Sequence, residues 1–101
     1  MILYSVTVSL PETLAAEWLQ WQKEIHIPEV LATGYFKHHQ MQKLLEPVIE
    51  AGFVTYNILY TTDSLEKLNN YRMHEAPRLQ AQHLERFGED VFAVRSVMEI
   101  C

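Results

Sequence analysis

Hydrophobic and polar residues alternate with a period of two in three stretches of the chain, residues 2–9, 53–62 and 91–100. This period is typical of a strand that buries one of its faces. Residues 35–45 also alternate, but neither face is clearly apolar, and Lys and His side chains occupy both. We therefore predict four strands, of which the second lies at an edge of the sheet.

A helical spacing of three and four residues separates the first two strands. Four apolar residues share one face of a helix predicted over residues 11–26, namely Leu14, Trp18, Trp21 and Ile25. Pro28 disfavours helical geometry in the residue before it, so we expect a break there. One further turn should follow and end at Gly34.

The second helix is predicted to begin after Asp63, a good N-cap residue, and to run from 64 to about 75. A proline at position 77 lacks a backbone N–H and clashes with the preceding turn, so we expect a kink near Glu75. The helix should resume over residues 77–87 and end at Gly88.

The order of elements predicts an α+β fold of the ferredoxin-like βαββαβ type, with residues 1–101 as a single domain. Two right-handed crossovers place both helices on one face of a four-stranded antiparallel sheet. The other face would mix polar and apolar residues: Leu3, Ser5, Thr7, Phe53, Asn57, Leu59, Arg95 and Val97. Because such a face is too apolar for water, we expect a homodimer whose two sheets close into an α/β barrel; an ordinary solvated face is the alternative.

Composition narrows the class of protein. Of the 101 residues, 49% are hydrophobic and 21% are charged, which suits one globular domain. The net charge of -5 argues against nucleic-acid binding, and no apolar run is long enough to cross a membrane. The first residues lack the basic head of a secretory signal, and the single cysteine, Cys101, excludes an internal disulfide. We therefore expect a cytoplasmic protein.

Side chains suited to acid–base chemistry are densest in two proline-containing segments, residues 26–34 and 71–87. We expect the first and third strands to be parallel, so that both helices start at one edge of the sheet and His26 and His74 lie at similar heights. The two imidazoles would then form an acid–base pair, and Arg78 beside them would bind an anionic group. In the alternative, each histidine only bonds the carbonyls that a helix break leaves free.

Trp18, Trp21 and Tyr56 would form the walls of a pocket next to these histidines, although tryptophans at this spacing are more often core residues. His83 falls on the projected buried stripe and is expected to be a hydrogen-bonded core or interface histidine. The histidines lack the spacing of a metal site, and no phosphate loop or dinucleotide fingerprint is present. We therefore predict neither a metal nor a cofactor.

Five segments carry a resemblance to a known family: residues 17–21, 26–34, 54–56, 74–79 and 83–88. With them the chain resembles, over nearly its whole length, the uncharacterised bacterial family known as domain of unknown function 4286. The resemblance implies membership of the dimeric α/β-barrel superfamily, which also holds antibiotic-biosynthesis-type monooxygenases, haem-degrading enzymes and EthD-like proteins. The family brings no established activity, so no catalytic residue is transferred from it.

We expect a small homodimeric protein that binds a small organic ligand in a pocket between helices and sheet. One alternative is a cofactor-independent monooxygenase-like enzyme. Another is a non-enzymatic dimeric scaffold or regulatory module. A fold of this kind hosts many functions, so the sequence leaves open whether the protein is an enzyme.

Overall fold

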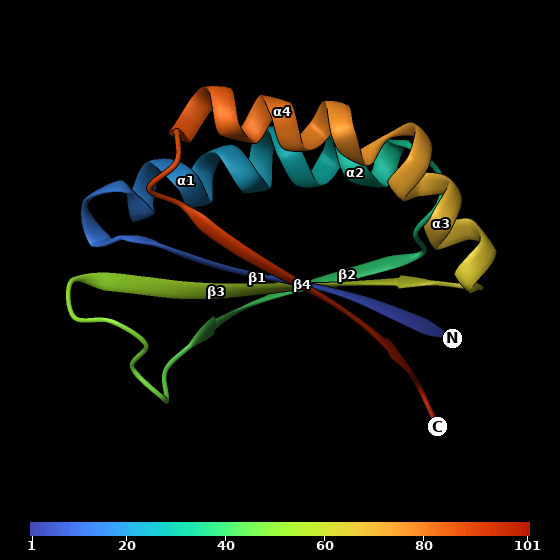
Figure 1. Ribbon diagram of the computed structural model, residues 1–101, viewed down its shortest axis with the longest axis horizontal. Coiled ribbons are helices and arrows are strands. Elements are labelled where there is room, and N and C mark those ends of the chain that lie inside the picture. Colours follow the sequence, from blue (N-terminus) through green and yellow to red (C-terminus); the bar gives the residue numbers. More distant parts are fainter.

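The computed structural model describes residues 1–101 as one layer of helices on one face of a four-stranded sheet (Figure 1). The strands are β1 (Ile2–Pro11), β2 (His38–Leu44), β3 (Phe53–Thr62) and β4 (Phe92–Glu99). They stand in the order β2-β3-β1-β4, and every neighbouring pair is antiparallel. The predicted ferredoxin-like arrangement is confirmed.

Each of the two helical regions has an irregularity near its proline. The first region consists of η1 (Glu12–Leu14), α1 (Ala15–Trp21), the π-helical segment η2 (Gln22–His26) and α2 (Ile27–Ala32). The second consists of α3 (Leu65–His74) and α4 (Ala76–Phe87), which meet at Glu75. The kink near Glu75 is confirmed, whereas the chain passes Pro28 without leaving the helix. None of these helices is both long and apolar enough to cross a membrane.

The core lies between the helices and the sheet. Its residues are apolar side chains from β1, β3 and the inner helix faces, with an aromatic group at one end: Tyr4, Phe36, Tyr60 and Tyr71. The rings of Phe36 and Tyr71 meet edge to face, with centroids 4.7 Å apart. Burial of such side chains contributes about 1.5–3 kcal/mol each to stability, which fixes the helices on this face.

Two sequence-based expectations about the sheet are wrong. β1 and β3 are antiparallel rather than parallel. In β4, Arg95 and Val97 pair with Val6 and Tyr4, which face the helices, so they lie on the helix side and not on the open face. Their places on the open face are taken by the residues that pair with the outward side of β1: Phe92, Val94, Ser96 and Met98.

The start of α3 also differs from the prediction. Ser64 is the N-cap residue, and its hydroxyl accepts a hydrogen bond of 3.2 Å from the backbone N–H of Lys67. Asp63 instead binds the ammonium groups of Lys37 and Lys67, at 2.8 and 2.9 Å. A short hydroxyl side chain caps a helix as well as a carboxylate does, so the carboxylate is free to form ion pairs.

Candidate functional site

The two histidines that were predicted to face each other do not share a site. His26 lines a cavity between helices and sheet, whereas His74 is exposed at the last residue of α3. The cause is the antiparallel pairing of β1 and β3, because helices that follow antiparallel strands start at opposite ends of the sheet. The prediction that His26 and His74 lie side by side is therefore wrong. A catalytic role of His74 stays a prediction, and no contact in the structure supports it.

Segment η2 places two polar side chains in the interior. It is a wide helical turn in which the backbone N–H of Ile27 donates to the carbonyl of Gln22, five residues earlier. The extra residue shifts the helix face, so that His26 and Ile27 turn inward while Ile25 is 44% exposed. The predicted apolar stripe is thus wrong at Ile25. Turns of this type are frequent at functional sites, and Gln22 and His26 mark the two ends of this one.

His83 of α4 lies where His74 was expected. The centroids of the His26 and His83 rings are 6.2 Å apart. His83 Nε2 accepts a hydrogen bond of 3.0 Å from the indole N–H of Trp18. Because Nε2 is the acceptor, the proton of neutral His83 lies on Nδ1. His83 is therefore hydrogen-bonded, as predicted, and its ring also lines the cavity beside His26.

Aromatic side chains that do not line the cavity contact the two imidazoles and hold them in place. The ring of Trp21 stacks on His26, with centroids 5.0 Å apart, and the edge of Phe87 meets Trp21 at 5.3 Å. Trp18 is fully buried and stacks on Tyr56 at 5.3 Å. Neither tryptophan lines the cavity. Trp18 and Trp21, predicted as pocket walls, hold the histidine rings in place instead.

The cavity is small, and its polar lining comes from both the sheet and the helices. Its volume is about 50 Å³, room for a few water molecules. The polar residues that line it are three tyrosines, Tyr4 of β1, Tyr60 of β3 and Tyr71 of α3, together with Gln22 and His26 of η2, Gln80 and His83 of α4, and Arg95 of β4. Gln22 Oε1 and His26 Nδ1 are buried and have no hydrogen-bond partner within the chain. An unpaired buried polar atom costs about 1–3 kcal/mol, so both atoms favour a bound molecule that hydrogen-bonds to them.

Burial keeps both histidines neutral at pH 7. It lowers the pKa of His26 from 6.5 to about 4, and His83 and Arg95 add smaller effects in the same direction. Burial, with a smaller effect of Arg95, also lowers the pKa of His83. A neutral imidazole can accept one hydrogen bond and donate another. With a pKa of about 4, however, His26 is a weak general base at pH 7 in the protein without ligand.

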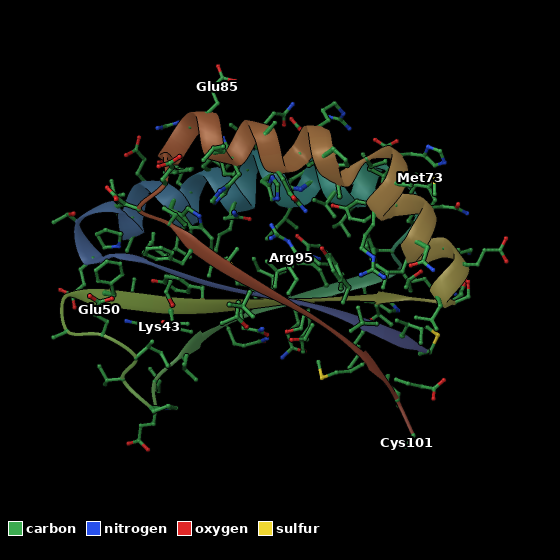
Figure 2. The ribbon with its side chains drawn as sticks, in the orientation of Figure 1. Lys43, Glu50, Met73, Glu85, Arg95 and Cys101 are labelled. Carbon is green, nitrogen blue, oxygen red and sulfur yellow. The ribbon has the colours of Figure 1, made fainter.

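Arg95 is the cation of this cavity, and the sequence did not indicate it. Figure 2 shows its side chain in the space between β4 and the helices. Apolar residues occupy both faces of β4, so the alternation along this strand does not show which face turns inward. Only the pairing of Arg95 with Val6, a residue on the fully apolar face of β1, places the side chain of Arg95 on the helix side of the sheet.

The other predicted ligand-binding residues lie elsewhere. Arg78 is exposed and binds the carboxylates of Glu75, at 3.0 Å, and Glu29, at 3.9 Å, so it joins the two proline-containing segments on the outside of the cavity. Tyr56 lines a separate groove of about 660 Å³ between the first helical region and β2. No three side chains of the metal-binding types His, Cys, Asp and Glu lie close enough to hold one ion.

This sheet topology, with a cavity under the helices, defines a protein of the ferredoxin-like α+β class. The structure is similar to that of an EthD family protein from Bacillus halodurans C-125 (TM-score 0.69, 13% identity, 100% of both chains). It is similar to a proposed antibiotic biosynthesis monooxygenase from Deinococcus radiodurans (TM-score 0.66, 15% identity, 100% of this chain and 93% of that chain). It is also similar to a dimeric ferredoxin-like protein from an uncultured marine organism (TM-score 0.66, 14% identity, 97% and 94%).

At these identities the likeness shows the fold alone. No curated protein has a matching sequence. The chain does match, over residues 1–101, the model of the family described as domain of unknown function (DUF4286), and it belongs to that family. The family is defined without an activity, so its function has to be argued from the cavity itself.

Proposed function

We propose that the protein is a homodimer that binds a small organic ligand in the cavity between its helices and its sheet. One observation carries the proposal: Gln22 Oε1 and His26 Nδ1 are buried at the cavity and have no partner. A ligand with a hydroxyl, amide or enol group could donate to Gln22 Oε1, and the same group could accept a hydrogen bond from His26 when the imidazole carries its proton on Nδ1. The neutral state of His26 favours hydrogen bonding over proton transfer at pH 7.

The homodimer would form through the helix-free face of the sheet. All eight residues of β4 are exposed in the single chain. Phe92 and Val94 are 58% and 66% exposed on the helix-free face. Large apolar side chains that are exposed side by side mark an interaction surface. The β2–β3 loop projects from the same side (Figure 1) and exposes Val48 to 76%. The ferredoxin-like protein from an uncultured marine organism, which has a similar fold, is described as dimeric and supports a dimer, though not a particular interface.

Native mass spectrometry of the purified protein tests ligand binding directly, and ligand-observed NMR with small organic compounds extends the search. We expect His26→Ala to weaken binding about tenfold or more, since one hydrogen bond and the ring surface are lost. His74→Ala is the matched control, because His74 is exposed and lies outside the cavity. Equal binding by both variants would contradict the assignment of the cavity as the site.

A cofactor-independent monooxygenase-like reaction is the second candidate. It is favoured by the two imidazoles on one cavity, because a bound anion would raise the low pKa of His26 toward neutrality. Oxygen consumption in the presence of the ligand tests it, with His26→Ala as the inactive variant. If no compound binds at all, the remaining candidate is a non-enzymatic dimeric scaffold or regulatory module.

A further inference from the structure

Two of the four arginines in the chain lack a carboxylate partner. Arg78 binds Glu75 and Glu29, and Arg86 binds Glu17. Arg72 and Arg95 form no ion pair, and the only hydrogen bond of Arg72 is one of 2.8 Å to the side chain of Asn69. The chain has 13 acidic and 8 basic residues, so carboxylates outnumber cations and still leave these two arginines without a partner.

Both unpaired arginines line the same depression. It has a volume of about 220 Å³, and Arg72 of α3 and Arg95 of β4 lie on it together with Tyr4, Ala76, Pro77 and Gln80. Three of these residues, Tyr4, Gln80 and Arg95, also line the inner cavity that holds His26 and His83. The depression therefore adjoins the inner cavity and forms its mouth.

The mouth is electrostatically positive. Burial raises the pKa of Tyr4, while the charges of Arg95 and Arg72 oppose that rise. Arg95 also lowers the pKa of both cavity histidines, as a nearby positive charge does. Neither the mouth nor the inner cavity is lined by an Asp or Glu side chain that would cancel this field.

We infer that the ligand of this cavity is a small organic carboxylate, bound with its charged group between Arg72 and Arg95 and its uncharged part directed past Gln80 toward His26. Guanidinium groups match the planar carboxylate and can form two parallel hydrogen bonds to it. The helix kink at Glu75 contributes to this geometry, because it lets α3 and α4 each bring a residue to the mouth. The inference deepens the proposed function and depends on it.

The size of the two spaces limits the ligand. The mouth has about 220 Å³ and the inner cavity about 50 Å³, which suits a single ring or a short branched chain better than an extended acyl chain. Benzoate is therefore a suitable probe. Benzamide has the same shape without the charge, and phenyl phosphate has the ring with a different anion.

Calorimetric titration of these three compounds into the protein tests the inference. We expect benzoate to bind about tenfold or more tightly than benzamide, and its affinity to fall with added salt. Arg72→Gln and Arg95→Gln should each weaken benzoate about tenfold and leave benzamide unchanged. Arg78→Gln is the matched control, since Arg78 is paired with acids outside the mouth, and it should bind benzoate as the unmodified protein does.

The outcomes separate the two proposals. If benzamide binds as well as benzoate while His26→Ala weakens both, the anion inference is overturned and the cavity remains the ligand site. If neither the unmodified protein nor any variant binds a probe, and no ligand copurifies, both proposals fail. Tighter binding of phenyl phosphate than of benzoate, with the same dependence on Arg72 and Arg95, supports the anion site but replaces carboxylate by phosphate as the group it holds. Circular dichroism of the two exposed arginine variants checks that they fold.

Discussion

His26 and His83 enter the folded protein as neutral imidazoles, although in the unfolded chain each has an ordinary pKa of 6.5. Their environment is aromatic: Trp21 stacks on one ring, and the indole of Trp18 donates to the other. A charged imidazole would lose its hydration in this place without gaining a counter-ion, since no carboxylate lines the cavity and the positive charge of Arg95 disfavours a second one. Protonation of either histidine therefore opposes folding.

We expect the free energy of unfolding to decrease as the pH falls from 6.5 toward 4. In this window the unfolded chain binds a proton at His26 and the folded chain does not, so acid favours the unfolded state. At about 1.4 kcal/mol per pKa unit, the shift from 6.5 to about 4 corresponds to a loss of about 3 kcal/mol, and His83 adds to it. Urea unfolding at several pH values measures the slope.

His26→Gln is the variant that isolates this effect, because glutamine cannot take up the proton. It should flatten the dependence of stability on pH between 6.5 and 4, whereas the exposed His74→Gln should leave it unchanged. Carboxyl groups also titrate at the acidic end of this range, but they do so equally in both variants. Parallel curves for the two variants would show that His26 is not responsible.

At the scale of secondary-structure elements, the decisive feature is the π-helical segment η2. It is followed directly by α2, which has Pro28 in its first turn, a position where the missing backbone N–H of a proline is tolerated, so the chain stays helical. Because of the wide turn, the buried residue that follows Gln22 is Ile27, five positions later, and His26 beside it faces the cavity. A regular α-helix would have placed Ile25 on the buried face instead.

Two alanine substitutions test this shift of the helix face. Ile27 is 3% exposed, so Ile27→Ala should lower the free energy of unfolding by about 2–4 kcal/mol through the cavity it leaves. Ile25 is 44% exposed, and Ile25→Ala should change stability by no more than about 0.5 kcal/mol. Chemical unfolding of both variants compares them. The opposite ranking would mean that the helix is regular through this region.

Much of the fold could be predicted from the sequence because β1 and β3 each have one face that is apolar nearly throughout, and because the helices carry long apolar stripes. The position of η2 could not be predicted, because apolar residues spaced three and four apart do not show where a turn contains one extra residue. The direction of β3 relative to β1 does follow from the order of the elements. A crossover makes β1 and β2 parallel, and a hairpin makes β2 and β3 antiparallel, so β1 and β3 have to be antiparallel. Antiparallel β1 and β3 separate His74 from His26 and leave His83 as the neighbour of His26.

At the scale of the whole molecule, only one of the two faces of the sheet is covered by other parts of the chain. Helices protect one face of the sheet, and only 19 of 101 residues are buried. On the helix-free face, the side chain of Asn57 donates hydrogen bonds to Ser5 and Thr7 at 2.8 and 3.0 Å. Because these polar groups satisfy one another, a second sheet could cover them without leaving them unpaired. In the proposed dimer β4 would have two roles: Arg95 faces the cavity, and Val94, on the helix-free face, would face the partner.

The last prediction concerns this face. We expect light scattering of the unmodified protein to give twice its chain mass of 11.8 kDa. The variant Val94→Asp should have the mass of the monomer, because a buried unpaired carboxylate strongly opposes association. Met73→Asp is the control: Met73 is 68% exposed on the helical layer, away from the helix-free face (Figure 2), and should leave the dimer intact. Since β4 also carries Arg95, the Val94→Asp monomer should bind benzoate more weakly as its edge strand loosens. A Val94→Asp protein that remains dimeric would place the interface elsewhere, and an unmodified protein that is monomeric at micromolar concentration would refute the homodimer.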